Sequence, residues 1–173
     1  MSNMQPPLVT LRAMEPEDLD ALYRIENDKQ LWCVSATNVP YSRYTLHDYI
    51  ANSSGDIYTD REVRLIIEDS RQAVVGILDL VNFDPRHLRA EVGIVIERPY
   101  RRQGIASAAL ADLHDYAAQV LHLHQLYAII GANRTAALSL FRSAGYQHTA
   151  TLRDWISEGS SYTDGMVMQL TLH

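Results

Sequence analysis

One segment of the chain constrains the fold more than any other, because it joins a strand pattern, a chain-breaking proline and a helix pattern. Ala90–Ile96 is short, apolar and β-branched, which is typical of a buried strand. Pro99 ends this run, since proline offers no N–H group to a β-ladder. After Gly104, apolar residues recur at helical spacing, at Ala106, Leu110, Leu113, Ala117 and Val120. The sequence therefore predicts a strand, a tight loop and a helix in direct succession.

The loop between this strand and this helix has the properties of an anion-binding site. The first N–H groups of a helix have no partner within the helix, and they point outward from its N-terminus. Arg101 and Arg102 precede that N-terminus, so two guanidinium groups reach the same space as the free N–H groups. A solubilising basic turn is the alternative interpretation of these two arginines.

The rest of the chain adds strands before this segment and a hairpin after it. We expect strands at 8–11, 62–68, 73–83 and 126–130, and helices from about Pro16 to Glu26 and at 45–52. A further helix ends before Gly145, and a hairpin joins 146–155 to 163–172. Three strands in hairpin order, followed by strand–helix–strand–helix, predict one α/β domain. Its sheet is expected to be mixed and mostly antiparallel, with a central parallel crossover.

Composition excludes several classes of protein. A chain of 173 residues is expected to form one domain, and its net charge of -6 argues against general nucleic-acid binding. Cys33 is the only cysteine, so no internal disulfide forms and a reducing compartment fits. No apolar run is long enough to span a bilayer, and the N-terminus lacks the pattern of a signal peptide. We therefore expect a cytoplasmic protein that binds neither membrane nor nucleic acid.

Four stretches together resemble the GNAT (Gcn5-related) N-acetyltransferase family. The pattern R-x-x-G-x-A at Arg101, Gly104 and Ala106 is similar to the family's acyl-CoA pyrophosphate loop. AEVGIVIE and LYAII resemble its fourth and fifth strands, and NRTAALSLFRSAGY resembles the helix that follows. The likeness spans nearly the whole chain and is greatest to the spermidine and ribosomal-protein N-terminal branches. It implies acceptor-side helices at 1–55, an acetyl-CoA-binding core at 62–145 and a C-terminal hairpin at 146–173.

The resemblance implies acetyl-CoA as co-substrate and assigns residues to it. The backbone of the strand would pair with the pantetheine arm, and one of its N–H groups would polarise the thioester oxygen. The loop would hold the pyrophosphate, with Gly104 allowing the backbone to approach closely. The implied cofactor-binding residues are Ile94, Val95, Ile96, Arg101, Arg102, Gln103, Gly104, Ile105, Ala106, Ser107, Asn133 and Phe141.

Acetyl transfer also needs a group that removes a proton from the amine. An alkylamine resembles lysine, with a pKa of about 10.4, so a base or a neutralising pocket is required near neutral pH. Glu91 lies where many family members carry a glutamate, and the resemblance implies that it acts as the base, directly or through a water. The alternative is a strand-edge carboxylate that bonds to nearby arginines.

The sequence differs from the family pattern at the position of the group that protonates the leaving thiolate. Phe141 stands where many members place a tyrosine, and its ring has no proton to donate. A thiol resembling cysteine has a pKa of about 8.5, so it can leave as a thiolate near neutral pH. Water, Ser139 or a tyrosine of the last hairpin could substitute, and Tyr162 is the candidate among the tyrosines.

In related enzymes the first two helices hold the acceptor. Polyamine acetyltransferases often carry acids before a Pro-Tyr pair, whereas here Thr37-Asn38-Val39 precedes Pro40-Tyr41 without an acid, which weakens the polyamine interpretation. Glu26, Asp28 and Tyr41 are the candidate substrate-binding residues; a solvated helix end is the alternative for the two acids.

The sequence thus predicts an acetyl-CoA-dependent N-acetyltransferase in which a primary amine attacks the thioester directly, without a metal. The amine belongs to a small molecule or to a peptide N-terminus, as in ribosomal-protein N-terminal acetyltransferases. The other class of function is a CoA-binding module that has lost transfer activity. An exposed terminal strand also favours a homodimer.

Overall fold

The computed structural model describes residues 7–29 and 39–173, so Cys33, Thr37 and Asn38 lie outside the described residues. Its strands form one sheet in the order β1-β2-β3-β4-β5-β7-β6. They are β1 Val9–Ala13, β2 Val63–Asp69, β3 Val74–Asp84, β4 Arg89–Ile96, β5 Gln125–Gly131, β6 Gln147–Ser157 and β7 Tyr162–Thr171. The helices are η1 Pro16–Asp18, α1 Leu19–Glu26, α2 Arg43–Asn52, α3 Ile57–Asp60, η3 Arg98–Tyr100, α4 Ile105–Gln119 and α5 Thr135–Ser143.

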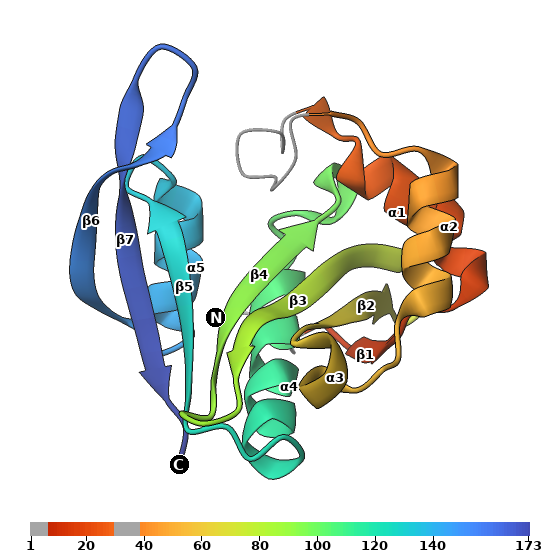
Figure 1. Cartoon of the computed structure of the whole chain (residues 1–173), viewed down its shortest axis with the longest axis horizontal. Coiled ribbons are helices and arrows are strands. Elements are labelled where there is room, and N and C mark those ends of the chain that lie inside the picture. The colour runs from red at the N-terminus through yellow and green to blue at the C-terminus, as the bar shows by residue number, and fades with distance from the viewer. Residues whose placement is uncertain (1–6, 30–38) are drawn as a thin grey trace, which may run out of the picture.

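The connections between strands confirm the expected single α/β domain. Strands β1 to β4 pair antiparallel with their neighbours, and α4 then carries the chain to β5, which pairs parallel with β4. Strand β7 pairs antiparallel with β5, and β6 pairs with β7 and forms one edge of the sheet, with β1 at the other. Figure 1 shows α4 behind β3 and β4, while α1 and α2 lie beside the opposite end of the sheet from β6 and β7.

Strands β4 and β5 diverge soon after they begin to pair. Their register runs only from Arg89–Glu91 on β4 to Gln125–Tyr127 on β5, although both strands continue beyond it. β4 instead follows β3 closely: a Cβ added at Gly76 would clash with the carbonyl oxygen of Val95. After Glu91, the edge of β4 that faces β5 therefore has no strand partner within residues 7–29 and 39–173.

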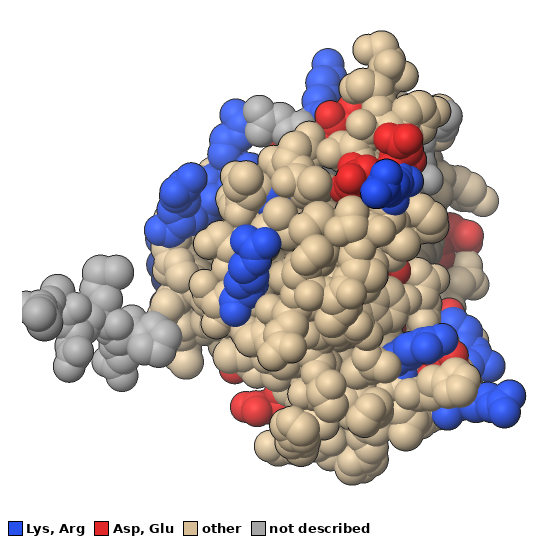
Figure 2. Space-filling model, turned by 90° about the vertical axis from the view of Figure 1, so that its left-hand side faces the viewer, with Lys and Arg blue, Asp and Glu red and all other residues tan. Residues whose placement is uncertain are grey.

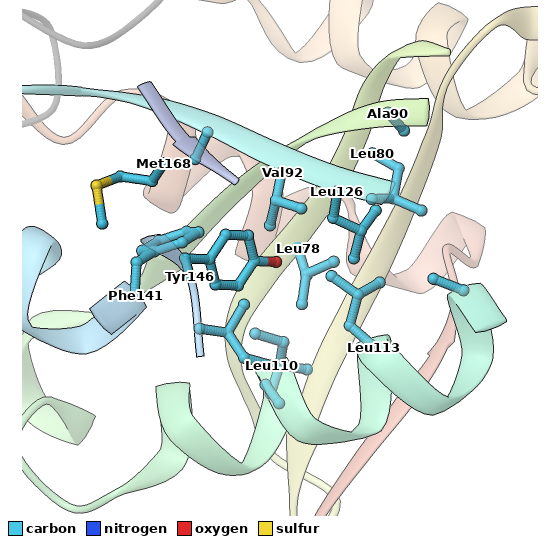
Figure 3. Close-up of a cluster of buried hydrophobic side chains, with 14 of the residues drawn as sticks. Leu78, Leu80, Ala90, Val92, Leu110, Leu113, Leu126, Phe141, Tyr146 and Met168 are labelled. Atoms are coloured by element: carbon cyan, nitrogen blue, oxygen red, sulfur yellow. The ribbon is translucent and has the colours of Figure 1, made fainter. Parts of the chain in front are cut away.

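The main core fills the space between α4, α5 and one face of the sheet. Figure 3 shows Leu110 and Leu113 of α4 directed at Leu78, Val92 and Leu126 of the sheet. The helical repeat is confirmed except at its last member. Val120 is 62% exposed because α4 ends at Gln119, and Leu121 packs against the core in its place.

A smaller apolar cluster attaches α1 and α2 to the other face of the sheet. Its buried members are Leu22, Ile25, Leu46, Ile66 and Ile77. Helix α2 begins two residues earlier than expected, because Ser42 accepts a 3.0 Å hydrogen bond from the Thr45 N–H and caps the helix.

Two helix ends show how local chemistry sets the element boundaries. Helix α3 was not expected from the sequence; it is a short helix that starts where Asp56 accepts a 3.0 Å hydrogen bond from the Tyr58 N–H. Gly145 follows α5 with a φ of 97°, which confirms the expected C-cap. No helix in the described ranges is long and apolar enough to cross a membrane.

Candidate active site

A cleft of about 1110 Å³ lies over the diverging strands. Residues of α1, α2, β2 and β3 line one wall, residues of β5, α5 and β6 line the other, and β4 lies between them. Of the expected site residues, the cleft brings together Glu26, Tyr41, Glu91, Ile94, Val95 and Phe141. The candidate base, two strand residues of the co-substrate site and two acceptor-side residues thus face one space.

Glu91 occupies the point where β4 and β5 part. Its side chain is half-buried, and its Oε2 accepts a 2.8 Å hydrogen bond from Asn82 Nδ2. Tyr127 lies beside it in the parallel register, and burial, reinforced by the charge of Glu91, raises the pKa of this phenol. The partner of Glu91 is therefore an amide and not an arginine, and the carboxylate has no ion-pair partner among the described residues.

An ion cluster lies in the acceptor-side wall, and it was not expected from the sequence. Arg64 donates two hydrogen bonds to Asp79, of 2.7 and 2.8 Å, and a third to Glu26. Burial would lower the pKa of Arg64, but the hydrogen bonds and charges of Asp79 and Glu26 raise it overall. Burial also raises the pKa of Tyr41, with a further contribution from the charge of Glu26.

A second acid stands next to this cluster. Tyr49 donates a 3.1 Å hydrogen bond from its hydroxyl to Glu62 Oε1, and the guanidinium carbon of Arg64 lies 5.4 Å from the centre of the tyrosine ring. Burial raises the pKa of Tyr49 well above its ordinary value, which keeps the phenol neutral. In total the cleft is lined by four carboxylates, Glu26, Glu62, Asp79 and Glu91, against the two guanidinium groups of Arg64 and Arg134. Its charge favours a cation.

The basic loop lies between η3 and α4, outside the residues that line the cleft. Arg101 donates from Nε to the Ile96 carbonyl oxygen over 2.8 Å, and Gln103 donates to the Pro99 carbonyl oxygen over 2.9 Å. Arg102 and Gly104 have positive φ angles, of 60° and 77°. The loop is thus tightly turned, Arg101 is tied to the end of β4, and the Arg102 side chain is exposed.

The remaining residues of the expected loop site differ in exposure. Ile105 is buried in the core, where it starts α4, and Ala106 is half-buried. Ser107 is exposed in the first turn of the helix. Ile96 is also buried, so its backbone and not its side chain is available to a ligand.

Besides Ile96 and the loop residues, four expected site residues either lie outside the cleft or line it with little exposed surface. Asn133 donates a 2.7 Å hydrogen bond to Glu158, and its neighbour Arg134 lines the cleft in its place. Asp28 is absent from the lining, and Tyr162 is 63% exposed at the start of β7, also outside it. Phe141 does line the cleft, but it is 4% exposed and packs edge-on against Tyr146 at 4.8 Å.

Comparison with known proteins places this arrangement in a family. The profile of the Acetyltransferase (GNAT) domain matches residues 9–147. The chain belongs to the GNAT acetyltransferase family. As a member it is an N-acetyltransferase that uses acetyl-CoA as donor, which confirms the fold and activity expected from the sequence.

Individual relatives are more distant. A spermidine N(1)-acetyltransferase of Escherichia coli K12 is 27% identical, over 95% of this chain and 87% of the relative. The [Ribosomal protein bS18]-alanine N-acetyltransferase of the same strain is 24% identical, over 94% and 97%. The crystal structure of a Vibrio cholerae spermidine N-acetyltransferase in complex with CoA and spermine superposes with a TM-score of 0.84, at 24% identity over 95% of both chains. At this identity the superposition supports the fold.

Proposed function

We propose that the enzyme acetylates the primary amine of a small molecule, which attacks the thioester of acetyl-CoA directly. The observation that supports this most is the half-buried carboxylate of Glu91 at the point where β4 and β5 part. A carboxylate there faces the same cleft as an acidic acceptor wall. An incoming ammonium group would be attracted by the wall and would meet a proton acceptor at the divergence.

The divergence of the strands suits the pantetheine arm of acetyl-CoA. Its amides need backbone partners, and β4 from Ile94 to Ile96 has an edge without a strand partner toward β5. Arg102 and Gly104 have positive φ angles and turn the loop tightly at the N-terminus of α4, and the free N–H groups of a helix N-terminus suit a pyrophosphate. In this proposal the segment 62–145 holds acetyl-CoA, while the first 55 residues contribute α1 and α2 to one wall of the cleft and the hairpin 146–173 contributes β6 to the other.

The reaction then needs one proton transfer before the new bond forms. Glu91 accepts a proton from the ammonium group, and the freed nitrogen lone pair attacks the thioester carbon. The C–N bond forms and the attacking nitrogen releases its second proton to water, while the C–S bond breaks and its electron pair leaves with the sulfur as a thiolate. Tyr162 remains the proposed proton donor to that thiolate, with water or Ser139 as alternatives, and the hydroxyl of Tyr127 in the cleft is a further one.

Glu26 and Tyr41 are the proposed contacts to the acceptor, because both line the cleft on the side of α1 and α2. Asp28 follows α1 in the sequence. In this proposal its negative charge attracts the ammonium group to the acceptor side of the cleft, but its side chain does not contact the amine. An acceptor at the N-terminus of a protein is the second candidate, motivated by the similarity to the ribosomal-protein alanine acetyltransferase.

We further propose a homodimer, formed through the free edge of β6. Figure 2 shows this side of the molecule, where most charged side chains lie around the margin and the middle is largely uncharged. A dodecameric structure is known for the Vibrio cholerae spermidine acetyltransferase, which is a precedent for assembly in a relative. A cytoplasmic location fits the single cysteine, and independence from metal, nucleic acid and membrane stays a prediction.

Thiol release from acetyl-CoA, measured with small amines and with short peptides, tests the proposal. We expect release with small primary amines that carry a free amino group, and none with their N-acetylated forms. Release with peptides alone would favour the protein acceptor. Binding of acetyl-CoA without release for any amine would overturn the transferase proposal in favour of a CoA-binding module.

A further inference from the structure

Trp155 has a large apolar side chain that is exposed to solvent and lines the cleft. It lines the cleft on the wall opposite α1 and α2, and it is 58% exposed. Single exposed apolar side chains are common on protein surfaces, but Trp155 lines a concave site, and ligand sites are concave and lined mainly by apolar and aromatic side chains. No part of the acetyl transfer derived above uses this residue.

A β-bulge turns Trp155 into this position. In the pairing of β6 with β7, Leu152 lies opposite Gly165 and Ile156 opposite Thr163, so the three residues 153–155 face Asp164 alone. Asp154 has a φ of 48°, and its N–H donates a 2.9 Å hydrogen bond to the Asp164 carboxylate. Bulges re-aim side chains and are frequent next to active sites.

The indole of Trp155 packs against the backbone of Gly165. A Cβ at this position would lie 2.9 Å from Cδ1 of Trp155 and 2.9 Å from Cγ2 of Ile129, distances that real Cβ atoms essentially never show. The indole can therefore lie directly on the backbone of β7 only because the residue beneath it has no side chain. The bulge and the glycine act on the same side chain, one directing it and the other supporting it.

The charges on the opposite wall limit how many ammonium groups the cleft would bind. Glu26 and Asp79 already pair with Arg64. Glu62 and Glu91 each have a neutral partner, the hydroxyl of Tyr49 and the amide of Asn82, and of these two only Glu91 lies at the divergence of the strands. One ammonium group at Glu91 and an apolar body reaching toward the indole match this distribution better than a chain of cations.

We propose that Trp155 contacts the acceptor and selects primary monoamines that carry an aromatic ring. The inference rests on the proposed function and narrows its substrate class to arylalkylamines. The ammonium group lies at Glu91, and the ring lies on the indole between Ile129 and Ile156, which also line the cleft. Aromatic contact and burial of the ring supply the discrimination.

The test compares phenethylamine with ethylamine, which share the reacting group and differ by the ring, for the wild type and for Trp155→Ala. We expect the wild type to prefer phenethylamine in kcat/KM by at least about tenfold, and Trp155→Ala to lose about tenfold of that preference. Trp155→Phe should keep most of it, and the KM for acetyl-CoA should not change. Tyr44→Ala serves as control, since Tyr44 is 81% exposed and does not line the cleft. An equal preference in the wild type and Trp155→Ala, or a wild type that prefers spermidine to phenethylamine, would overturn the proposal.

A binding measurement separates this inference from the activity itself. The chain has two tryptophans, so Trp32→Phe leaves Trp155 as the only indole that fluoresces. We expect phenethylamine to change this emission with saturation, and ethylamine to leave it unchanged at the same concentrations. If acetyl transfer occurs but phenethylamine leaves the emission unchanged, the inference fails while the proposed function stands. If no amine is acetylated, the proposed function fails independently of this signal.

Discussion

Asn82 and Glu91 are joined by a 2.8 Å hydrogen bond at the point where β4 and β5 stop pairing. The amide donates to Oε2, which leaves Oε1 without a side-chain partner among the described residues. This relationship gives the candidate base a defined orientation without neutralising its charge, as an arginine partner would.

Replacing Glu91 by glutamine tests its role as the base. Glu91→Gln keeps the shape and the hydrogen-bonding capacity but cannot accept the ammonium proton, so turnover should fall by about a hundredfold. The loss should be greatest at low pH, where more of the amine is protonated. Steady-state rates from pH 6 to 9 measure this, with the KM for acetyl-CoA as the internal control. Unchanged turnover across this range would exclude Glu91 as the base.

Replacing Asn82 tests whether the amide only positions the carboxylate. Asn82→Ala removes one hydrogen bond, worth about 1 kcal/mol, so kcat should fall by about fivefold, far less than for Glu91→Gln. The double variant with Glu91→Gln should be no slower than Glu91→Gln alone, because an amide can position the carboxylate only where that carboxylate is present. Independent, multiplicative losses would instead indicate that Asn82 acts on the reaction by another route.

Arg64 holds two carboxylates in a largely buried part of the acceptor wall, with its side chain 15% exposed. Arg64→Met leaves both acids without their cation, so the free energy of unfolding should fall by about 3 kcal/mol. Arg24→Met is the control, because the ion pair of Arg24 with Glu97 is on the surface and should contribute less than about 1 kcal/mol. Urea denaturation measures the free energy of unfolding of both variants. Equal losses would show that the buried ion cluster stabilises the fold no more than the surface ion pair does.

Asp18 links β1 to the first helices through Arg12, which donates two hydrogen bonds to it, of 2.7 and 2.8 Å. Burial would raise the pKa of Asp18, but the hydrogen bonds from Arg12 and the Glu15 N–H lower it. A lowered pKa in the folded state stabilises the protein above the unfolded value of about 3.9, and this stabilisation is lost as pH falls through the folded pKa.

Asp18→Asn should therefore cost about 2 kcal/mol at pH 7, and the difference from wild type should shrink below about pH 4. Urea denaturation at a series of pH values measures this. The control is Asp20→Asn, whose carboxylate is 78% exposed and should matter little at any pH. A deficit for Asp18→Asn that stays constant down to pH 3 would contradict the linkage.

The sequence predicted the elements whose pattern is local. The helix α4 follows from apolar spacing, and the loop before it from Pro99 and Gly104. The mixed sheet follows from the order of strands and helices. Val120 was misplaced because periodicity does not show where a helix stops, and α3 was missed because four residues carry almost no period. Its one signal was Asp56, a residue type that often caps helices.

The site was predictable only where it rests on a motif. Glu91 was found by resemblance, but its partner Asn82 was not, since a tertiary contact between β3 and β4 brings them together. Arg64 and Asp79 interrupt apolar strands, which is the signal that could have marked them as a pair. Trp155 had no such signal, because its orientation depends on a bulge and on Gly165 across the sheet.

The mass of the intact protein, recorded together with the products of a single turnover, tests direct acetyl transfer most directly. With acetyl-CoA alone, we expect no free thiol and no acetylated protein. After a primary amine is added, one N-acetylated amine should appear for each thiol released, and the mass of the protein should stay unchanged. Thiol release before the amine is added, with an acetyl group left on the protein, would contradict direct attack and require an acyl-enzyme.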